Sequence, residues 1–503
     1  MRNSLTRLSR SLTLVVLAVL CLDLGARAQE RPSPKLTFEE LARSFIDRHC
    51  KKGAPVTECA FDTVIEKSYA RFDLGLFAVH YPVEFLEDKG KCEALRGVLL
   101  GLVDVEQRWL DWVEPVAPAD DTLHKDLAAM RAWIKGWKSG AFSNLERAAD
   151  KDWLVALKPD AAIGDAVKRV QSALLSTERF TFVPTDGKAA RVLLCPTRRD
   201  FMELLSYGGL VDEAARTRNW WSISADWTQF WIDRTVCIAL EYTPWEGSDP
   251  EFRTGLAMTK LSPTGTVQHV VQQAALALLR QCAPTVSEST LDRALASALT
   301  LQVCGEFTTI DNAGSVSTSG ARTAPYERFV PGGNPKGGTL PAIKADSQNA
   351  IVENHWRKGG GKDRFLTPLR EGQKLGAKEA KGKDPLANFL LLGDGGKHVV
   401  YAPFFGPHAS EQEYPPPAFV IDYAEFFRSY RTSFVCWLAD HGDATPAASK
   451  EKFSKLVRAL STCTPDRSFE VVVSEVYGVP ISGKDGTTDS LEWRFLKWIQ
   501  SGK

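Results

Sequence analysis

The sequence predicts a mostly helical α+β protein: a helical N-terminal domain, a core of helices and a small mixed sheet, and a C-terminal helical subdomain. Three observations support this class. Apolar residues recur at helical spacing over residues 36–175. Shorter runs with the alternation of strands follow over residues 179–242. Helical spacing then returns, both in residues 266–306 and after residue 386.

Composition limits the classes of protein to consider. A chain of 503 residues predicts two or three domains. Apolar residues make up 44% of the chain and include 14 Trp and 25 Phe, enough for sizeable cores. With 62 acidic and 62 basic residues the formal net charge is zero, whereas nucleic-acid binders carry a basic excess. We therefore expect no nucleic-acid partner.

Residues 1–28 have the pattern of a secretory signal peptide. An apolar run, Leu12–Leu20, follows three arginines, and Ala26-Arg27-Ala28 fits a cleavage site. An uncleaved anchor is the less favoured alternative because the run is short for a bilayer. A lipoprotein is disfavoured because Leu20 precedes Cys21. The mature chain is expected to be periplasmic or extracellular, without a membrane span.

Residues 29–178 are predicted to form an all-helical N-terminal domain. Thr37 and Glu40 form a capping box ahead of the first helix. Further helical runs cover Ala60–Glu87, Cys92–Val113, His124–Lys138 and Ala161–Leu175. Four tryptophans share helical spacing, which fits an aromatic ligand groove or, more simply, a packed helix interface: Trp109, Trp112, Trp133 and Trp137.

Residues 179–242 are expected to form strands around one helix. Arg179–Pro184 and Ala190–Pro196 fit strands, and a helix opens at Thr197 and ends before Gly208. Trp220–Tyr242 alternates as a pair of antiparallel strands would.

The stretch Thr266–Glu306 contains two helical runs separated by a polar loop. His269 and Gln273 are four residues apart, which places them on one face of the first run. Ser297 lies in the second run, 28 residues after His269.

This spacing resembles the zinc site of the gluzincin metallopeptidases, as found in exported bacterial peptidase-like proteins. There an HExxH helix supplies two His ligands and a Glu base, and a later helix supplies a Glu ligand. In this chain His269-Val-Val-Gln-Gln273 stands where the HExxH motif would be, with Val270 at the position of the Glu base. ALASALT (Ala294–Thr300) stands where the later helix would be, with Ser297 at the position of the Glu ligand. The resemblance implies a degenerate site that has lost zinc and catalysis. The alternative is an ordinary core helix with a structural His.

The order of elements is similar to that of a zincin core, here residues 179–312. In such folds an edge strand lies beside the substrate, so the resemblance implies a cleft that four tryptophans could line: Trp220, Trp221, Trp227 and Trp231. Packing against the sheet is the simpler reading of these side chains. Residues 386–503 are similar to the family's C-terminal helical subdomain, with helical runs at Asp422–Asp440, Lys450–Leu460, Ser468–Tyr477 and Asp489–Gln500.

Residues 313–385 form a Gly-, Ser- and Pro-rich insertion that is expected to be partly disordered. From Arg357 to Lys383 it holds nine Lys/Arg and three Asp/Glu. This segment could contact an anionic surface such as a cell-wall polymer, although a solvated loop is the simpler interpretation.

Other chemistry has weaker support. His398 and His408, with Glu411 and Glu413, could form a metal site but have irregular spacing. Ser449 and Lys452 match a Ser-x-x-Lys pair without its partner motifs. Nine cysteines remain once Cys21 leaves with the signal, and Cys50–Cys59 and Cys282–Cys304 are the disulfides to test first.

The sequence therefore predicts an exported, non-catalytic pseudo-peptidase that binds a peptide, an envelope protein or a polysaccharide, or that has a structural role there. One alternative is an active hydrolase with a non-standard site or a metal near His398 and His408. Another is a purely structural helical protein, which would lack a sheet between Arg179 and Tyr242.

Overall fold

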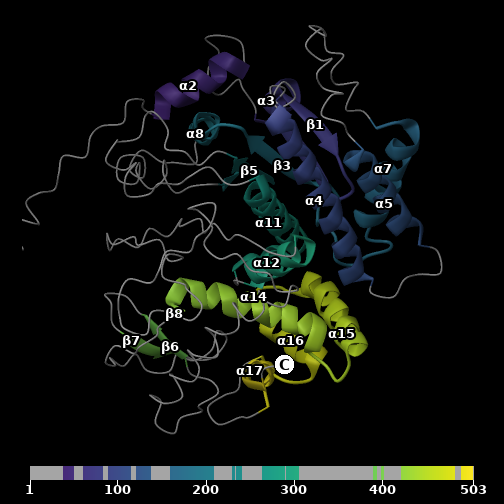
Figure 1. The fold of residues 1–503 in the computed structure, drawn as a ribbon, viewed down its shortest axis with the longest axis vertical. Helices are drawn as coiled ribbons and strands as arrows, with labels where there is room; N and C mark the ends of the chain where they lie inside the picture. The colour runs from purple at the N-terminus through teal and green to yellow at the C-terminus, as the bar shows by residue number, and fades with distance from the viewer. Residues whose placement is uncertain are drawn as a thin grey trace, which may run out of the picture.

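A computed structural model of the chain describes thirteen segments: residues 38–49, 61–82, 89–114, 121–136, 159–208, 229–232, 234–240, 263–288, 291–304, 389–392, 398–401, 421–481 and 489–501. In these segments the protein is mostly helical, with one small mixed five-stranded sheet and one three-stranded sheet (Figure 1). The predicted α+β class is confirmed at this level.

The elements before residue 305 form the larger part of the described structure. Its helices are α2 (Phe38–His49), α3 (Phe61–Ser68), α4 (Lys89–Val113), α5 (Thr122–Lys135), α7 (Ala161–Leu174), α8 (Arg198–Tyr207), α11 (Pro263–Cys282) and α12 (Leu291–Cys304). Its strands are β1 (Tyr69–Asp73), β2 (Phe77–Pro82), β3 (Ala190–Cys195), β4 (Gln229–Ile232) and β5 (Thr235–Ala239).

The five strands make a mixed sheet in the order β1-β2-β3-β5-β4. The three central strands are parallel, with Phe77 opposite Ala190 and Arg191 opposite Thr235. The two edge strands, β1 and β4, are antiparallel to their neighbours. Strand β3, helix α8, the β4–β5 hairpin and helix α11 follow one another in the chain, which is the order expected from the sequence.

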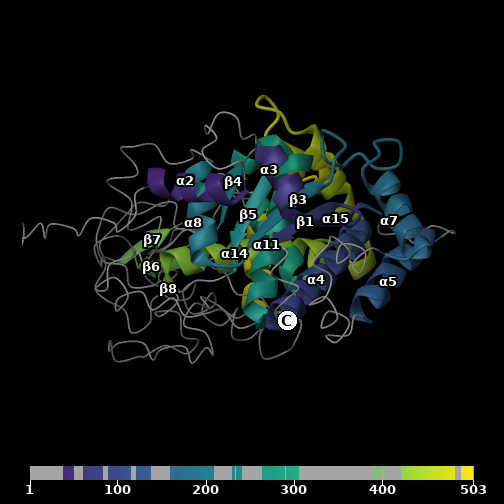
Figure 2. The same ribbon diagram turned by 90° about the horizontal axis from the view of Figure 1, so that it is seen from above.

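Helices cover both faces of this sheet (Figures 1 and 2). On one face α4 and α11 pack against alternate strand residues such as Val79, Val192 and Val236, and this core continues through α12 into the C-terminal helices. On the other face α2, α3 and α8 enclose a smaller core with Leu193 and Cys237. The alternation of side chains along each strand gives the two faces separate cores.

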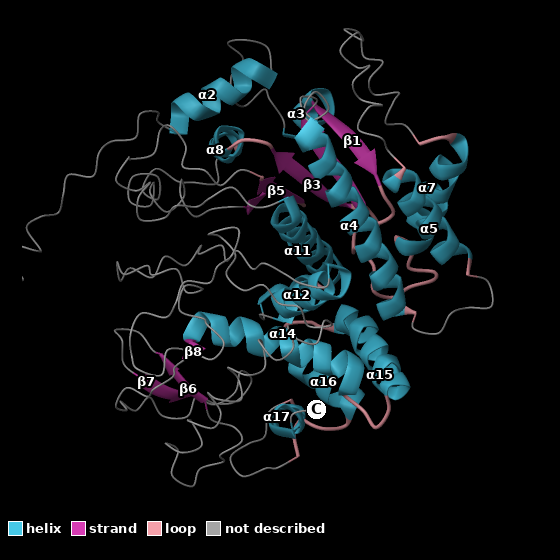
Figure 3. Cartoon of the chain, viewed as in Figure 1, coloured by secondary structure: helices cyan, strands magenta, loops and turns pink. Residues whose placement is uncertain are grey.

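The C-terminal part stacks helices beyond α12, as the secondary-structure colours make clear (Figure 3). These are α14 (Tyr423–His441), α15 (Pro446–Ala459), α16 (Phe469–Tyr477) and α17 (Leu491–Ser501). Local signals set their ends. The Thr445 hydroxyl accepts the Ala448 N–H at the start of α15, and Gly478 ends α16 with a left-handed φ of 73°.

Several expectations are wrong at the level of elements. The run Ala60–Glu87 is helical only to Ser68 and then forms β1 and β2, so residues 29–178 are not all-helical. Arg179–Pro184 forms turns and bends rather than a strand. The region 386–503 also contains a small sheet, β6 (Phe389–Leu392), β7 (His398–Tyr401) and β8 (Ile421–Asp422).

The aromatic and cysteine expectations have mixed outcomes. Trp109 and Trp112 are buried in the larger core, and Trp109 stacks on Phe182 at 5.1 Å, as packing predicts. Trp133 stacks on Phe72, and Trp137 lies outside the described segments. Cys282 and Cys304 are thiols, so their expected disulfide is wrong. Cys50, Cys59, the signal segment and the 313–385 insertion lie outside the described residues.

Candidate functional site

Helix α11 is fixed in place by its contact with α4. A Cβ atom on Gly97 would lie 2.9 Å from Val267, and one on Gly101 would lie 2.7 Å from Val271. Val267 and Val271 are four residues apart and therefore share one face of α11, which meets α4 where that helix has no side chains.

The candidate residues lie on the other side of α11. At about 100° per residue, His269, Gln272 and Gln273 point away from the Val267–Val271 face. His269 is fully buried and Gln273 is 4% exposed. Val270, at the position of the general base, is a buried member of the larger core. This helix therefore has a buried polar face where an amphipathic helix would present an exposed one.

Helix α12 brings Ser297 to this polar face. The Gln272 Nε2 donates a hydrogen bond to Ser297 Oγ at 3.0 Å. The expected second-ligand position, Gln273, is the next residue along α11, so Ser297 lies beside the turn that carries it. Sequence reasoning missed Gln272, although its spacing of three from His269 is enough to place both on one face.

An ion pair holds the same two helices together nearer the loop that joins them. Arg280 of α11 donates from Nε to Asp292 Oδ2 of α12 at 2.9 Å. Burial raises the pKa of Asp292, although the hydrogen bond and charge of Arg280 act in the opposite direction. Asp292 is 2% exposed, so Arg280 provides the charge that a buried carboxylate requires.

The donor set of this site is an imidazole, two amides and a hydroxyl. Catalytic zinc is held by three ligands drawn from His, Cys and carboxylates, and the bound water needs a base nearby. Within the described segments, three His, Cys, Asp or Glu side chains are nowhere grouped in a way that could hold a metal ion. The Oε1 atoms of Gln272 and Gln273 are buried and have no hydrogen-bond partner among the described residues. Such a site can form hydrogen bonds, but Val270 cannot take a proton.

The proposed cleft residues are only partly placed. Trp231 lies on the edge strand β4, partly buried against the larger core, with the Arg280 guanidinium 5.1 Å from its ring centre. Trp220, Trp221 and Trp227 lie outside the described residues, as does His408. His398 begins β7, and the structure does not describe its side chain.

Ser449 and Lys452 do not form an accessible nucleophile. Ser449 is fully buried, accepts the Asp443 N–H at 2.9 Å and donates to the Thr445 carbonyl at 2.9 Å. Lys452 is paired with Asp443 at 2.7 Å. The Ser449 hydroxyl therefore stabilises the start of α15, and the Lys452 ammonium is held in an ion pair with Asp443.

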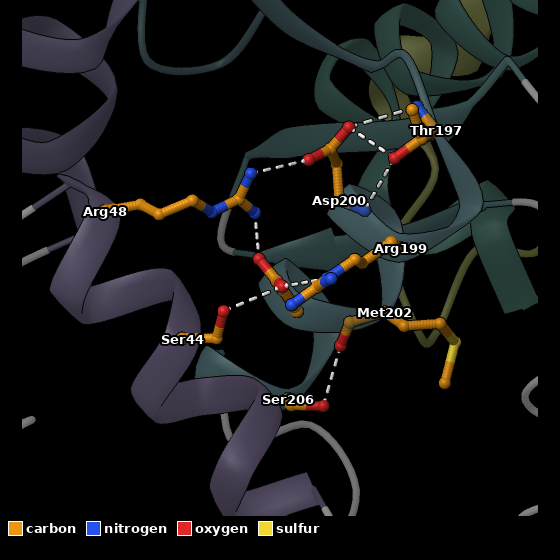
Figure 4. A network of polar contacts seen from close by, with 8 residues as sticks. Ser44, Arg48, Thr197, Arg199, Asp200, Met202 and Ser206 are labelled. Carbon is orange, nitrogen blue, oxygen red and sulfur yellow. Dashed lines mark hydrogen bonds and ion pairs between the residues drawn. The ribbon is translucent and has the colours of Figure 1, made fainter. Parts of the chain in front are cut away.

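A second polar network joins α2 to α8 on the opposite face of the sheet (Figure 4). The fully buried Glu203 carboxylate accepts hydrogen bonds from Ser44 Oγ at 2.9 Å, from Arg48 and from Arg199 Nε at 2.8 Å. Arg48 also pairs with Asp200, which forms a capping box with Thr197 at the start of α8. Because each carboxylate already has cationic or hydroxyl partners, this network holds two helices together rather than awaiting a ligand.

Comparisons with known proteins add nothing to this geometry. No protein-family model matches the chain, and neither a curated protein nor a solved structure matches it. Within the described residues, the structure has no helix whose length and apolar character would let it cross a membrane.

Proposed function

We propose that the chain is an exported, non-catalytic pseudo-peptidase related to the gluzincins, which uses its retained cleft or its N-terminal helices for binding. Its partner would be a peptide, an envelope protein or a polysaccharide. One observation carries the proposal. The positions that correspond to the zinc ligands and base are held by His269, Val270, Gln273 and Ser297, and α12 packs Ser297 against the polar face of α11.

The order of elements supports the same proposal. A mixed sheet with an antiparallel edge strand precedes α11, and α12 follows it. This arrangement is the one that the resemblance implies for a zincin core. The purely structural alternative would lack a sheet between Arg179 and Tyr242, and β3, β4 and β5 lie there. The runner-up is an active hydrolase with a non-standard site or a metal near His398 and His408, for which the described residues provide no specific support.

Zinc content tests the proposal directly. The purified mature protein should hold well under one zinc per chain after dialysis, measured by inductively coupled plasma mass spectrometry. One tightly held zinc per chain would overturn the proposal, and His398, His408 and His441 would then be the first residues to replace.

A gain-of-metal variant tests the assigned positions. Gln273→His with Ser297→Glu restores three protein ligands around His269 and should raise zinc content to about one per chain. Gln281→His with Ser297→Glu makes the same chemical changes, but Gln281 lies two turns away and binds the Arg234 carbonyl, so this control should remain without zinc. If both variants fold, as judged by circular dichroism, and bind zinc equally poorly, the assigned positions are wrong.

A further inference from the structure

One face of the sheet brings together three basic side chains from three adjacent strands. Arg71 of β1 stands directly opposite His80 of β2, and Arg191 of β3 stands opposite Ala78, two residues before His80. Residues that are opposite one another, or two apart along a strand, share a face of a sheet. Phe77, Val79 and Tyr81 of β2 belong to the larger core, so the three basic residues lie on the other face, with α3.

Three buried polar atoms in this group have no hydrogen-bond partner among the described residues. They are both ring nitrogens of His80 and the Nε of Arg191. His80 is only 2% exposed. Burying a polar group without a partner costs free energy, and native proteins rarely leave one unsatisfied without a bound water or ion. The adjacent strands β2 and β3 therefore carry buried nitrogen atoms that could form further hydrogen bonds.

The surroundings of His80 are electropositive. Burial first, and then the charges of Arg71 and Arg191, lower the pKa of His80 to about 4, while Asp62 acts in the opposite direction. Asp62 of α3 pairs with Arg191 Nη1 at 2.5 Å, and Asp73 pairs with Arg71 Nε at 2.7 Å. These aspartates are 61% and 41% exposed, so both guanidinium groups already bind carboxylates at the solvent side of the group.

We propose that Arg71, His80 and Arg191 form a binding site for a small tetrahedral oxyanion of the phosphate and sulfate class. Guanidinium groups match the oxygens of such anions with paired N–H donors, and the neutral imidazole of His80 adds one N–H donor. The anion would displace Asp62 and Asp73, which are exposed and can turn into solvent. This site lies on the opposite face of the sheet from α11 and does not depend on the proposed function.

The test titrates sulfate into the full chain labelled with ¹⁵N-histidine, with sodium chloride at matched ionic strength as the reference. The His80 ring signals, assigned from their loss in His80→Phe, should shift saturably with sulfate and not with chloride. Arg191→Gln removes one charged donor and should weaken binding at least tenfold. Asp62→Asn removes a competing carboxylate and should strengthen binding several-fold.

The Asp62→Asn variant keeps the test informative if Arg191→Gln does not fold, because Asp62 is an exposed side chain. Asp165→Asn makes the same change at a 61% exposed residue of α7 and should leave binding unchanged. A sulfate response that is the same in Asp62→Asn, Asp165→Asn and the unchanged protein would mean an adventitious ion only. No saturable response in folded Asp62→Asn would mean that ordered water satisfies His80. Either outcome overturns the proposal.

Discussion

Glu106 is a carboxyl group enclosed by the larger core, where it binds the turn between β1 and β2. Its Oε1 accepts the Leu76 N–H at 2.5 Å, and the N–H groups of Gly75 and Phe77 also favour its charged form. Burial outweighs these bonds and raises the pKa of Glu106 from 4.5 to about 8. The carboxyl is therefore neutral at pH 7.

The raised pKa predicts a loss of stability at alkaline pH. Below pH 4.5 the folded and unfolded states both bind this proton, and between pH 4.5 and about 8 only the folded state does. The free energy of unfolding then falls by about 1.4 kcal/mol per pH unit. His80, with a pKa lowered from 6.5 to about 4, gives the opposite slope up to pH 6.5, so the loss becomes visible above that pH. We expect the free energy of unfolding, measured by urea unfolding, to fall by about 2 kcal/mol between pH 6.5 and pH 8.

Glu106→Gln should abolish this loss because an amide does not titrate. Glu93→Gln makes the same change at a partly exposed site on the same helix and should keep the slope of the unchanged protein. Equal slopes for Glu106→Gln and Glu93→Gln would show that Glu106 is not the group responsible.

At the residue scale the sequence predicted the candidate site only in part. A spacing of four identified His269 and Gln273, and both are buried on α11. The contact that joins α11 to α12 instead uses Gln272, because the crossing of the two helices, which no spacing encodes, decides which residue of the polar face meets Ser297. His80 gave no signal because it is a single polar residue in an apolar run, and Glu106 gave none because it lies among other polar residues, Asp104, Gln107 and Arg108. The burial of both depends on partners distant in sequence.

At the element scale the close contact of α4 and α11 depends on two glycines one turn apart. Gly97 and Gly101 leave room for Val267 and Val271, and this contact sets the rotation of α11 about its axis. The rotation in turn directs the polar face of α11 toward α12. A small change on α4 would therefore alter the candidate site without touching it.

Gly101→Ala should destabilise the protein although alanine favours helices. The new Cβ would lie 2.7 Å and 3.3 Å from Val271 and Val267, and overpacking of this kind costs roughly 1–3 kcal/mol against about 1 kcal/mol gained in helix propensity. Gly164→Ala on α7 meets no atom within 4 Å and should stabilise by about 0.5–1 kcal/mol. Urea unfolding measures both changes.

Val271→Ala provides a further control. In combination with Gly101→Ala it relieves the contact, so the double variant should be more stable than the sum of the two single effects predicts. If Gly101→Ala stabilises the protein as much as Gly164→Ala does, α4 and α11 do not approach closely at this point.

The errors in the predicted elements have physical causes. Strand β2 is buried on both faces, so Phe77–Tyr81 is apolar except for His80, and periodicity cannot separate such a run from a buried helix. Arg179–Pro184 shows the opposite error. Phe180 and Phe182 alternate with polar residues and are buried, but Phe182 packs on Trp109 of α4 and no strand forms. The helices α8, α11 and α12 were predictable because caps and long periodic runs are local signals.

At the scale of the whole molecule the sheet separates two cores of unequal size. The larger core takes residues from Ala70 to Phe495 and contains Cys282 and Cys436, while the smaller core, under α2, α3 and α8, contains Cys195 and Cys237. Burial raises the pKa of both Cys237 and Cys282, so neither thiol is reactive in the folded protein. The four thiols therefore report on the opening of the two cores.

Alkylation across a urea series should modify Cys195 and Cys237 at lower urea than Cys282 and Cys436. The smaller core buries less apolar surface, so the unit that encloses it opens at a lower free energy. Peptide mass spectrometry after a short iodoacetamide pulse resolves the four sites. Modification of all four at one urea concentration would contradict this prediction and would mean that the two cores unfold as one unit.

The pairing of β2 with β3 also constrains the order in which the chain can fold. Phe77 and its partner Ala190 are more than a hundred residues apart, so β2 cannot pair with β3 until α4, α5 and α7 have been synthesised. At roughly 5–20 residues per second this interval lasts about 6–23 s, during which an apolar strand has an open edge. A fragment that ends at residue 178 would keep that edge permanently and should self-associate. In a cell the first third of this chain would depend on a chaperone until β3 arrives.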